Sequence, residues 1–155
     1  MGWFMEIATN PYVAAGVTSW LLAQVAKLFI YWIVNKKFDI MRLFGDGGMP
    51  SGHSATVVSV ATTCAFLNGF ASFEFAISFI LAIIVCHDAT GVRLETGKQA
   101  VLIKEIAAII EKIADQKVSD DVKLKEFVGH TVSQVIIGSL LGAANASILC
   151  LTVFG

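Results

Sequence analysis

Charged residues are scarce in this sequence, and the scarcity excludes most soluble proteins. Only 15% of the 155 residues are charged, whereas 56% are hydrophobic and the mean hydropathy is +0.75. Soluble domains carry about 25% charged residues. The formal net charge of -1 also argues against nucleic acid as a partner, since nucleic-acid-binding proteins need a basic surface. We expect residues 1–155 to form a single integral-membrane domain.

Cysteine is also scarce, and its placement argues against a disulfide framework and a metal site. The three cysteines all lie inside apolar runs, at Cys64, Cys86 and Cys150. We interpret them as small packing residues, and we expect neither a metal nor another cofactor. The N-terminal residues lack the basic start and cleavage pattern of a signal peptide, so we expect the chain to enter the membrane through its own first helix.

Long apolar runs dominate the rest of the sequence, at residues 12–34, 55–67, 75–86 and 131–154. Asn10 and Pro11 suit the start of the first run, because Asn caps helices and Pro favours their first position. In lipid the backbone must satisfy its own hydrogen bonds, so the runs should be helical. The sequence therefore predicts an all-α polytopic membrane bundle of about four spans. The two shorter runs also suit buried helices of a soluble core.

Residues 98–117 carry a different, amphipathic pattern. Apolar residues recur there at helical spacing, at Leu102, Ile103, Ile106, Ile109, Ile110 and Ile113, with charged residues on the other face. Such a helix can lie in the membrane interface or pack against the rest of the protein. We add it to the predicted bundle as an interfacial helix and leave the packed alternative open.

The basic residues give the predicted bundle an orientation. Apart from Lys27, they follow the first run or lie between the third and fourth, at Lys36, Lys37, Arg42, Arg93, Lys98, Lys104, Lys112, Lys117, Lys123 and Lys125. With alternating spans, these segments share one face, and positive charges favour the cytoplasm. We therefore predict a multi-pass protein of the cell membrane with this face in the cytoplasm.

A polar stretch, GGMPSGHSA, interrupts the apolar runs at residues 47–55. Ser51 precedes a predicted helix start, where free N–H groups and the helix dipole favour an anion such as phosphate. The glycines let the backbone approach a ligand closely. An ordinary cap by Ser51 or Ser54 is the simpler explanation, but a cap needs neither the glycines nor His53. We therefore expect an anion site at Ser51 and Gly52.

Other polar residues are predicted to end on the same face. His130 opens the last run, and Gln134 follows one turn later on the same side. Lys27 lies at membrane depth, where ionisable residues are usually functional, although lysines near a helix end also snorkel to the headgroups. Histidine can transfer protons near neutral pH and can act as a nucleophile. His87, next to Asp88, fits a structural role better.

Four strings, in this order, are similar to the divergent membrane branch of the type-2 phosphatidic acid phosphatase and vanadium haloperoxidase superfamily. They are Gln24 with Lys27, the loop GGMPSGHSA, DATGVR with GKQA, and GHTVSQV. The resemblance extends from Gln24 to about Gly142. It implies a metal-independent integral-membrane phosphatase that hydrolyses a lipid phosphomonoester or pyrophosphate through a phosphohistidine intermediate.

The resemblance also implies roles for individual residues. His130 would attack phosphorus, and His53 would protonate the leaving group. The phosphate would be held by Lys27, Ser51, Gly52 and Arg93. Because the family's first signature is not intact here, Lys36 and Arg42 compete with Lys27 as the first phosphate-binding cation. With so few helices, little protein surrounds such a site. We therefore expect lipid partners and leave a homo-oligomer open.

Gln134 departs from the family pattern, because an acidic residue normally orients the nucleophile from this position. A neutral amide can orient an imidazole, but it stabilises imidazolium less. Asp88 is a substitute if it folds beside His130. The alternative function is therefore a catalytically weak or inactive membrane module that binds lipid phosphate headgroups or a partner protein.

The predicted topology can be tested by cysteine accessibility. Asn68 follows the second run and should lie outside, so Asn68→Cys in a chain without its native cysteines should react with an impermeant thiol reagent in intact cells. Lys37→Cys, on the predicted cytoplasmic face, should react only after the membrane is opened. Labelling of Asn68→Cys from the cytoplasm alone would contradict the four-span topology.

Overall fold

Helices form all of the regular secondary structure in the residues that the computed structural model describes, which are 2–38, 40, 47–114 and 129–154. They are α1 (Gly2–Ala8), α2 (Pro11–Asn35), α3 (Gly52–Asn68), α4 (Phe73–Thr90), α5 (Val92–Ala114) and α6 (Val132–Thr152). Within these residues, three segments are long and apolar enough to cross a membrane, judged by length and composition: Pro11–Asn35, Phe73–Ile110 and Val132–Thr152. The predicted all-α membrane bundle is confirmed.

The start of α2 follows the local sequence signals. The side chain of Asn10 accepts hydrogen bonds from the backbone N–H groups of Tyr12 and Val13, at 3.0 and 3.2 Å. Pro11 occupies the first turn, where its missing N–H group is not needed. The predicted cap is therefore confirmed, and the helix continues through the whole first apolar run to Asn35.

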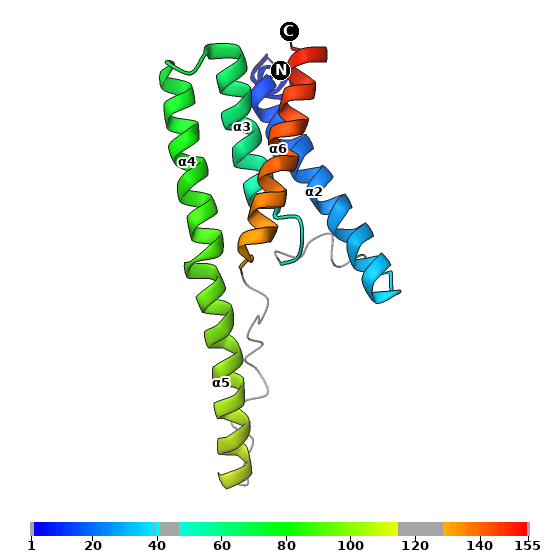
Figure 1. The fold of residues 1–155 in the computed structure, drawn as a ribbon, viewed down its shortest axis with the longest axis vertical. Helices are drawn as coiled ribbons and strands as arrows, with labels where there is room; N and C mark the ends of the chain where they lie inside the picture. Colours follow the sequence, from blue (N-terminus) through cyan, green and yellow to red (C-terminus); the bar gives the residue numbers. More distant parts are fainter. Residues whose placement is uncertain (1, 39, 41–46, 115–128, 155) are drawn as a thin grey trace.

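Helix α3 lies at the centre of the bundle, with α2, α4 and α6 packed around it (Figure 1). Its 17 residues rise by only about 25 Å at 1.5 Å per residue, less than the roughly 30 Å of a bilayer core. Its buried residues are small or carry hydroxyl groups, at Gly52, Ser54, Ala55, Ser59, Ala61, Thr63 and Cys64. The second apolar run therefore forms the inner helix on which the others pack.

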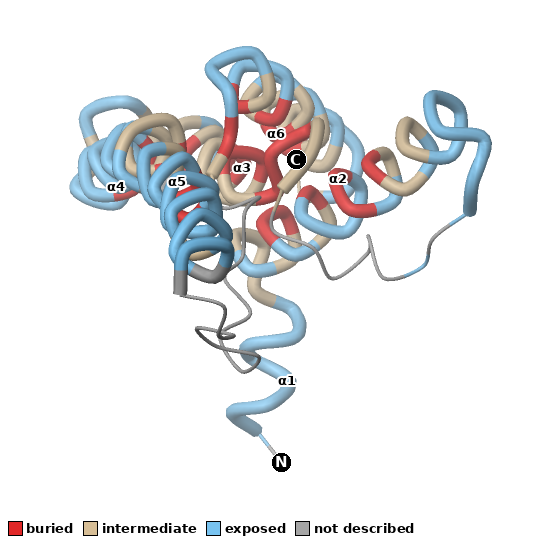
Figure 2. Tube along the Cα trace, turned by 90° about the horizontal axis from the view of Figure 1, so that it is seen from below, coloured by how far each residue is buried: buried red, intermediate tan, exposed pale blue. Residues whose placement is uncertain are grey.

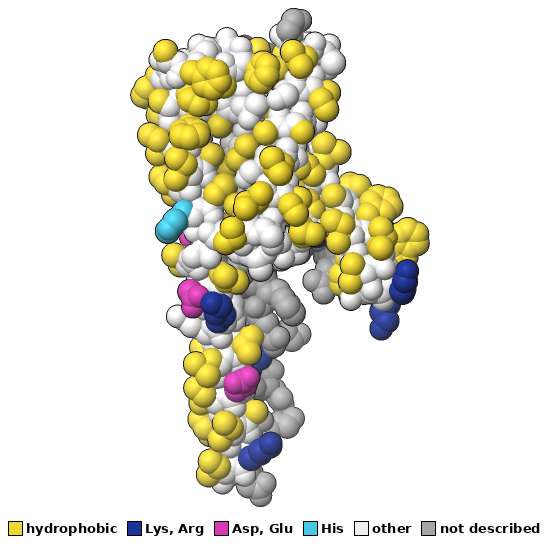
Figure 3. All heavy atoms as spheres, viewed as in Figure 1, with side chains coloured by type: hydrophobic (Ala, Val, Ile, Leu, Met, Phe, Trp, Pro, Cys, Tyr) yellow, Lys and Arg dark blue, Asp and Glu magenta, His cyan; other side chains and the backbone are white. Residues whose placement is uncertain are grey.

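Small residues fill the interior, and large apolar side chains are exposed. Figure 2 shows the buried residues where α2, α3 and α6 come together, and Figure 3 shows hydrophobic side chains spread over an outer face. The fully buried alanines are Ala15, Ala23, Ala55 and Ala146, whereas Phe29, Trp32, Ile84 and Leu140 are about half or more exposed. Asn145 donates hydrogen bonds to Thr18 and Ser19, which joins α6 to α2. Helix contacts in lipid depend on close packing and polar bonds rather than on hydrophobic burial, so this arrangement is typical of a membrane bundle.

Helix α6 approaches the backbone of α3 through two glycines. A Cβ atom built on Gly142 would lie 2.1 Å from the carbonyl oxygen of Ala55, and one built on Gly138 would lie 2.3 Å from Ser54 Oγ. Neither position therefore has room for a side chain. The two glycines form a G-x-x-x-G motif, which lets helices pack backbone to backbone in membranes.

Helix α5 continues the direction of α4 and extends beyond the other helices (Figure 1). The apolar residues of its amphipathic pattern are exposed, at Leu102, Ile103, Ile106, Ile109, Ile110 and Ile113. Its buried residues, Gly97 and Ala100, lie outside that pattern. The alternative in which this apolar face packs against the rest of the protein is therefore wrong for the part of the chain described, and its position in the membrane interface stays a prediction.

The contact between α3 and α6 should not tolerate even one methyl group. We expect Gly142→Ala to lower the free energy of unfolding by about 1–3 kcal/mol, because the added Cβ meets backbone atoms that cannot rotate away. Thermal unfolding of the detergent-solubilised protein measures the change. Gly2→Ala is the matched control, since no atom lies within 4 Å of a Cβ built there. Equal melting temperatures for both variants would contradict the proposed tight contact.

Candidate functional site

The polar segments of the sequence meet at the end of the bundle where α3 and α6 begin and α4 ends. The backbone N–H of His130, just before α6, donates to the carbonyl oxygen of Ala89 near the end of α4, at 2.9 Å. The N–H of Ser51, just before α3, donates to the carbonyl oxygen of Gln134 in α6, at 3.0 Å. These two bonds join segments that are far apart in the sequence.

His53 and His130 lie side by side in this region. Their ring centroids are 5.8 Å apart, and the ring planes meet at 60°. His130 is only 1% exposed, whereas His53, in the first turn of α3, is half-buried. One imidazole is thus enclosed by the protein, and the other is partly exposed.

Gln134 orients the ring of His130. Its side-chain oxygen Oε1 accepts a hydrogen bond from the N–H of Thr131 at 3.1 Å, and it lies 3.2 Å from Nδ1 of His130. An oxygen acceptor requires the proton to be on Nδ1, so a neutral His130 keeps its lone pair on Nε2. This tautomer suits nucleophilic attack from Nε2.

The N-terminus of α3 is positioned by Ser51. The hydroxyl of Ser51 accepts from the N–H of Ser54 at 3.4 Å, so the predicted cap is present. The N–H of Ser51, which was expected to bind phosphate, is instead used by the carbonyl of Gln134. The amides of Gly52 and His53 open the first turn, where N–H groups have no acceptor within the helix. An anion at this end would therefore meet the first turn at Gly52 and His53, while Ser51 holds the turn.

Gly138 is a residue of the site that the sequence prediction missed. A Cβ atom built on it would lie 2.4 Å from the carbonyl oxygen of Ser51, so the glycine lets α6 reach the turn before α3. The sequence signal was the G-x-x-x-G spacing from Gly138 to Gly142, which is typical of close helix packing in membranes.

Lys27 is buried beside the loop that precedes α3. It is 4% exposed, and a Cβ atom built on Gly48 would lie 3.3 Å from its Cγ. Gly48 has φ +99°, which favours glycine. A cavity of about 160 Å³ lies beside this lysine. It is lined by Lys27, Tyr31, Gly47, Gly48 and Met49 among others. A lysine that snorkelled to the headgroups would be exposed, so that alternative is wrong.

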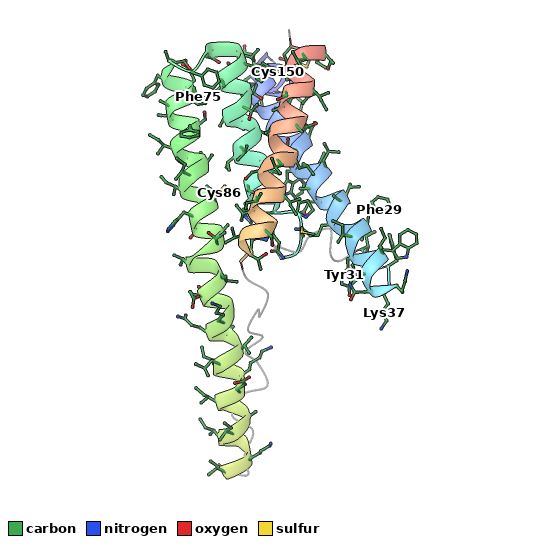
Figure 4. The ribbon with its side chains drawn as sticks, in the orientation of Figure 1. Phe29, Tyr31, Lys37, Phe75, Cys86 and Cys150 are labelled. Carbon is green, nitrogen blue, oxygen red and sulfur yellow. The ribbon has the colours of Figure 1, made fainter. Side chains whose placement is uncertain are left out.

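The competing cations are less well placed. Lys36 ends α2 and is exposed, and Figure 4 shows the next residue, Lys37, at the far end of α2, away from the other helices. Arg42 lies outside the described residues. Arg93 is in the first turn of α5, but its side chain is outside what the structure describes. Among the described cations, Lys27 is therefore the best placed to reach a ligand at α3.

Asp88 and His87 lie near the end of α4. Asp88 is half-buried and directly precedes Ala89, whose carbonyl oxygen binds the backbone of His130. The orienting contact on Nδ1 of His130, however, comes from Gln134. His87 is exposed, and its backbone carbonyl oxygen accepts from the N–H of Gly91, so the structural role of its side chain stays a prediction.

Two comparisons with known proteins found similar sequences. A model of the divergent PAP2 family matches residues 8–145, a range that includes every residue discussed for the site. An uncharacterized membrane protein of Bacillus subtilis (strain 168), YuiD, is 36% identical over 146 residues, which cover 89% of this chain and 92% of the relative. No solved structure matches the chain.

The tautomer of His130 is open to direct measurement. In ¹⁵N-histidine NMR spectra at a pH where the ring is neutral, we expect His130 to carry its proton on Nδ1. In Gln134→Leu, both neutral tautomers of His130 should be populated. The free energy of unfolding should fall by about 1 kcal/mol, because the hydrogen bond from the N–H of Thr131 to the side chain of residue 134 is lost. The exposed His87 is the internal control. A proton on Nε2 in the unaltered protein would refute the role given to Gln134.

Proposed function

The chain belongs to the divergent PAP2 family, and on that premise we propose that it is an integral-membrane lipid phosphate phosphatase. It hydrolyses a lipid phosphomonoester or pyrophosphate through a phosphohistidine intermediate. The proposal rests on one observation: the ring centroids of His53 and His130 are 5.8 Å apart at the N-terminus of α3. One ring is buried with its Nδ1 facing Gln134, and the other is half-buried.

The phosphate binds in front of the first turn of α3. The amides of Gly52 and His53 and the positive end of the helix dipole attract the anion. Lys27 adds a positive charge from α2, and its burial strengthens the attraction, since fewer water molecules screen it. Arg93 supplies a second cation from α5. Phosphoryl transfer depends mainly on such positioning and charge stabilisation.

The reaction proceeds in two steps. Nε2 of His130 attacks phosphorus, the bond from phosphorus to the lipid oxygen breaks, and protonated His53 gives its proton to that oxygen. In the second step His53 takes a proton from water, the resulting hydroxide attacks phosphorus, and the P–N bond to His130 breaks. Orthophosphate leaves, and both histidines return to their initial protonation states. The roles of acid and base suit an imidazole near neutral pH.

A second candidate function rests on Gln134. The phosphorylated imidazole carries more positive charge than the free ring, and a neutral amide stabilises that charge less than a carboxylate would. A catalytically weak or inactive membrane module that binds lipid phosphate headgroups or a partner protein is therefore the alternative. It would bind a lipid phosphate without turnover, even after Gln134→Glu restores a negative charge beside His130.

Two histidine variants test the proposed reaction. In His130→Ala, we expect the release of phosphate from a lipid phosphate to fall to background, because no nucleophile remains. In His53→Ala, the rate should fall by about 10²–10⁴-fold with an alkyl leaving group. It should fall much less with a nitrophenyl ester, whose oxygen leaves without being protonated. Phosphate release by protein purified in detergent measures both, with vanadate as the inhibitor.

Ser133→Ala is a control for these variants, since Ser133 is exposed in the first turn of α6. Unchanged activity of a folded His130→Ala protein would contradict the phosphohistidine mechanism. Binding without hydrolysis in the unaltered chain and in Gln134→Glu would favour the headgroup-binding module instead.

A further inference from the structure

Gln24 lies on the side of α2 that is turned toward the loop before α3. On this face the ring of Trp20 lies 3.3 Å from the position of a Cβ on Gly52, and Lys27 lies 3.3 Å from that of a Cβ on Gly48. Gln24 is four residues after Trp20 and three before Lys27, and residues at this spacing share one side of a helix. Its side chain therefore faces the segment between the two glycines, at the proposed phosphate site.

The side chain of Gln24 is buried with an unused acceptor. Gln24 is 7% exposed, and its Oε1 has no hydrogen-bond partner in the part of the chain that the structure describes. Folding leaves a buried carbonyl oxygen unpaired only rarely, because its lost hydration is not replaced. An unpaired acceptor beside an anion site indicates a donor that arrives with the ligand.

The chemistry of an amide oxygen restricts that donor. An oxygen that only accepts hydrogen bonds repels a bare phosphate oxygen but binds a P–OH group. A phosphate monoester has its second pKa at about 6, so its monoanion, which carries a P–OH, is well populated in mildly acidic to neutral solution. Orthophosphate keeps a P–OH as monoanion and as dianion, whereas the sulfate dianion has none. An acceptor at this position therefore distinguishes phosphate from sulfate.

We infer that Oε1 of Gln24 accepts a hydrogen bond from the P–OH of the bound phosphoryl group, so that the site selects the singly protonated phosphate monoester. The inference rests on the proposed function, because the ligand is the phosphate held before α3. Lys27 and the amides of Gly52 and His53 donate to the unprotonated oxygens, and Gln24 receives the one oxygen that carries a proton. A hydroxyl of a lipid headgroup has the same donor chemistry, and the experiment separates the two sources.

The test compares the unaltered chain with Gln24→Met, which keeps the shape of the side chain and removes the acceptor. In detergent at equal ionic strength, orthophosphate should raise the melting temperature of the unaltered chain more than sulfate does. Gln24→Met should respond equally to both anions. Its ligand-free melting temperature should be unchanged or higher, because the orphaned acceptor is gone. Gln99→Met is the matched control at an exposed position of α5.

A kinetic measurement identifies the source of the donor. With phosphatidic acid, whose only hydroxyl donor is its P–OH, Gln24→Met should raise KM about 5- to 10-fold at pH 6, and less at pH 8, where the P–OH is largely lost. If KM rises only for a lipid with a glycerol phosphate headgroup, and the unaltered chain responds equally to phosphate and sulfate, the donor is a headgroup hydroxyl and the P–OH assignment is overturned.

Two further outcomes separate this inference from the proposed function. A lower ligand-free melting temperature in Gln24→Met, with the preference for phosphate and the KM intact, would make Gln24 a structural residue and overturn the inference while the phosphatase stands. A preference for phosphate that Gln24→Met abolishes, in a chain that hydrolyses no lipid phosphate, would support the inference while the proposed hydrolysis fails.

Discussion

The close approach of α6 to the start of α3 is the contact on which the rest of the site depends. Gly138 and Gly142 leave no room for a Cβ atom against Ser51, Ser54 and Ala55. Because the two backbones meet directly, the N-terminus of α6 is fixed beside the N-terminus of α3. This contact brings His130 to His53 and lets the carbonyl of Gln134 reach the N–H of Ser51. Side chains of ordinary size here would separate the helices, and with them the two imidazoles.

Gln134 couples the two halves of the site through a single residue. Its carbonyl oxygen holds the turn before α3 through Ser51, and its side-chain oxygen lies against Nδ1 of His130. A shift of α6 would therefore move the turn and the imidazole together. In the proposed reaction, such coupling would hold the phosphate at α3 in a fixed position relative to Nε2 of His130, which in-line attack on phosphorus requires.

Several polar side chains are buried in the interior of the helix bundle, where lipid would not solvate them. Lys27 and Gln24 are both more than nine-tenths buried, and His130 is almost completely so. The interior around them is lined by small residues, while the large apolar side chains face outward. A membrane protein gains little from burying leucine or phenylalanine away from lipid. Its interior is therefore free to hold hydroxyl, amide and charged groups, provided that they bond to one another or to a ligand.

The sequence by itself determined the features that depend on neighbours along the chain. Apolar runs fixed the helices, Asn10 fixed the start of α2, and the spacing of four residues fixed the pairing of His130 with Gln134. Only the tertiary structure decided that Lys27 rather than Lys36 is buried beside the loop, that the N–H of Ser51 is used inside the protein, and that His53 lies against His130. Helical periodicity states which side of a helix a residue occupies. It does not state which helix faces that side, because this depends on where two backbones can touch. Here Gly138 and Gly142 allow α6 to touch α3.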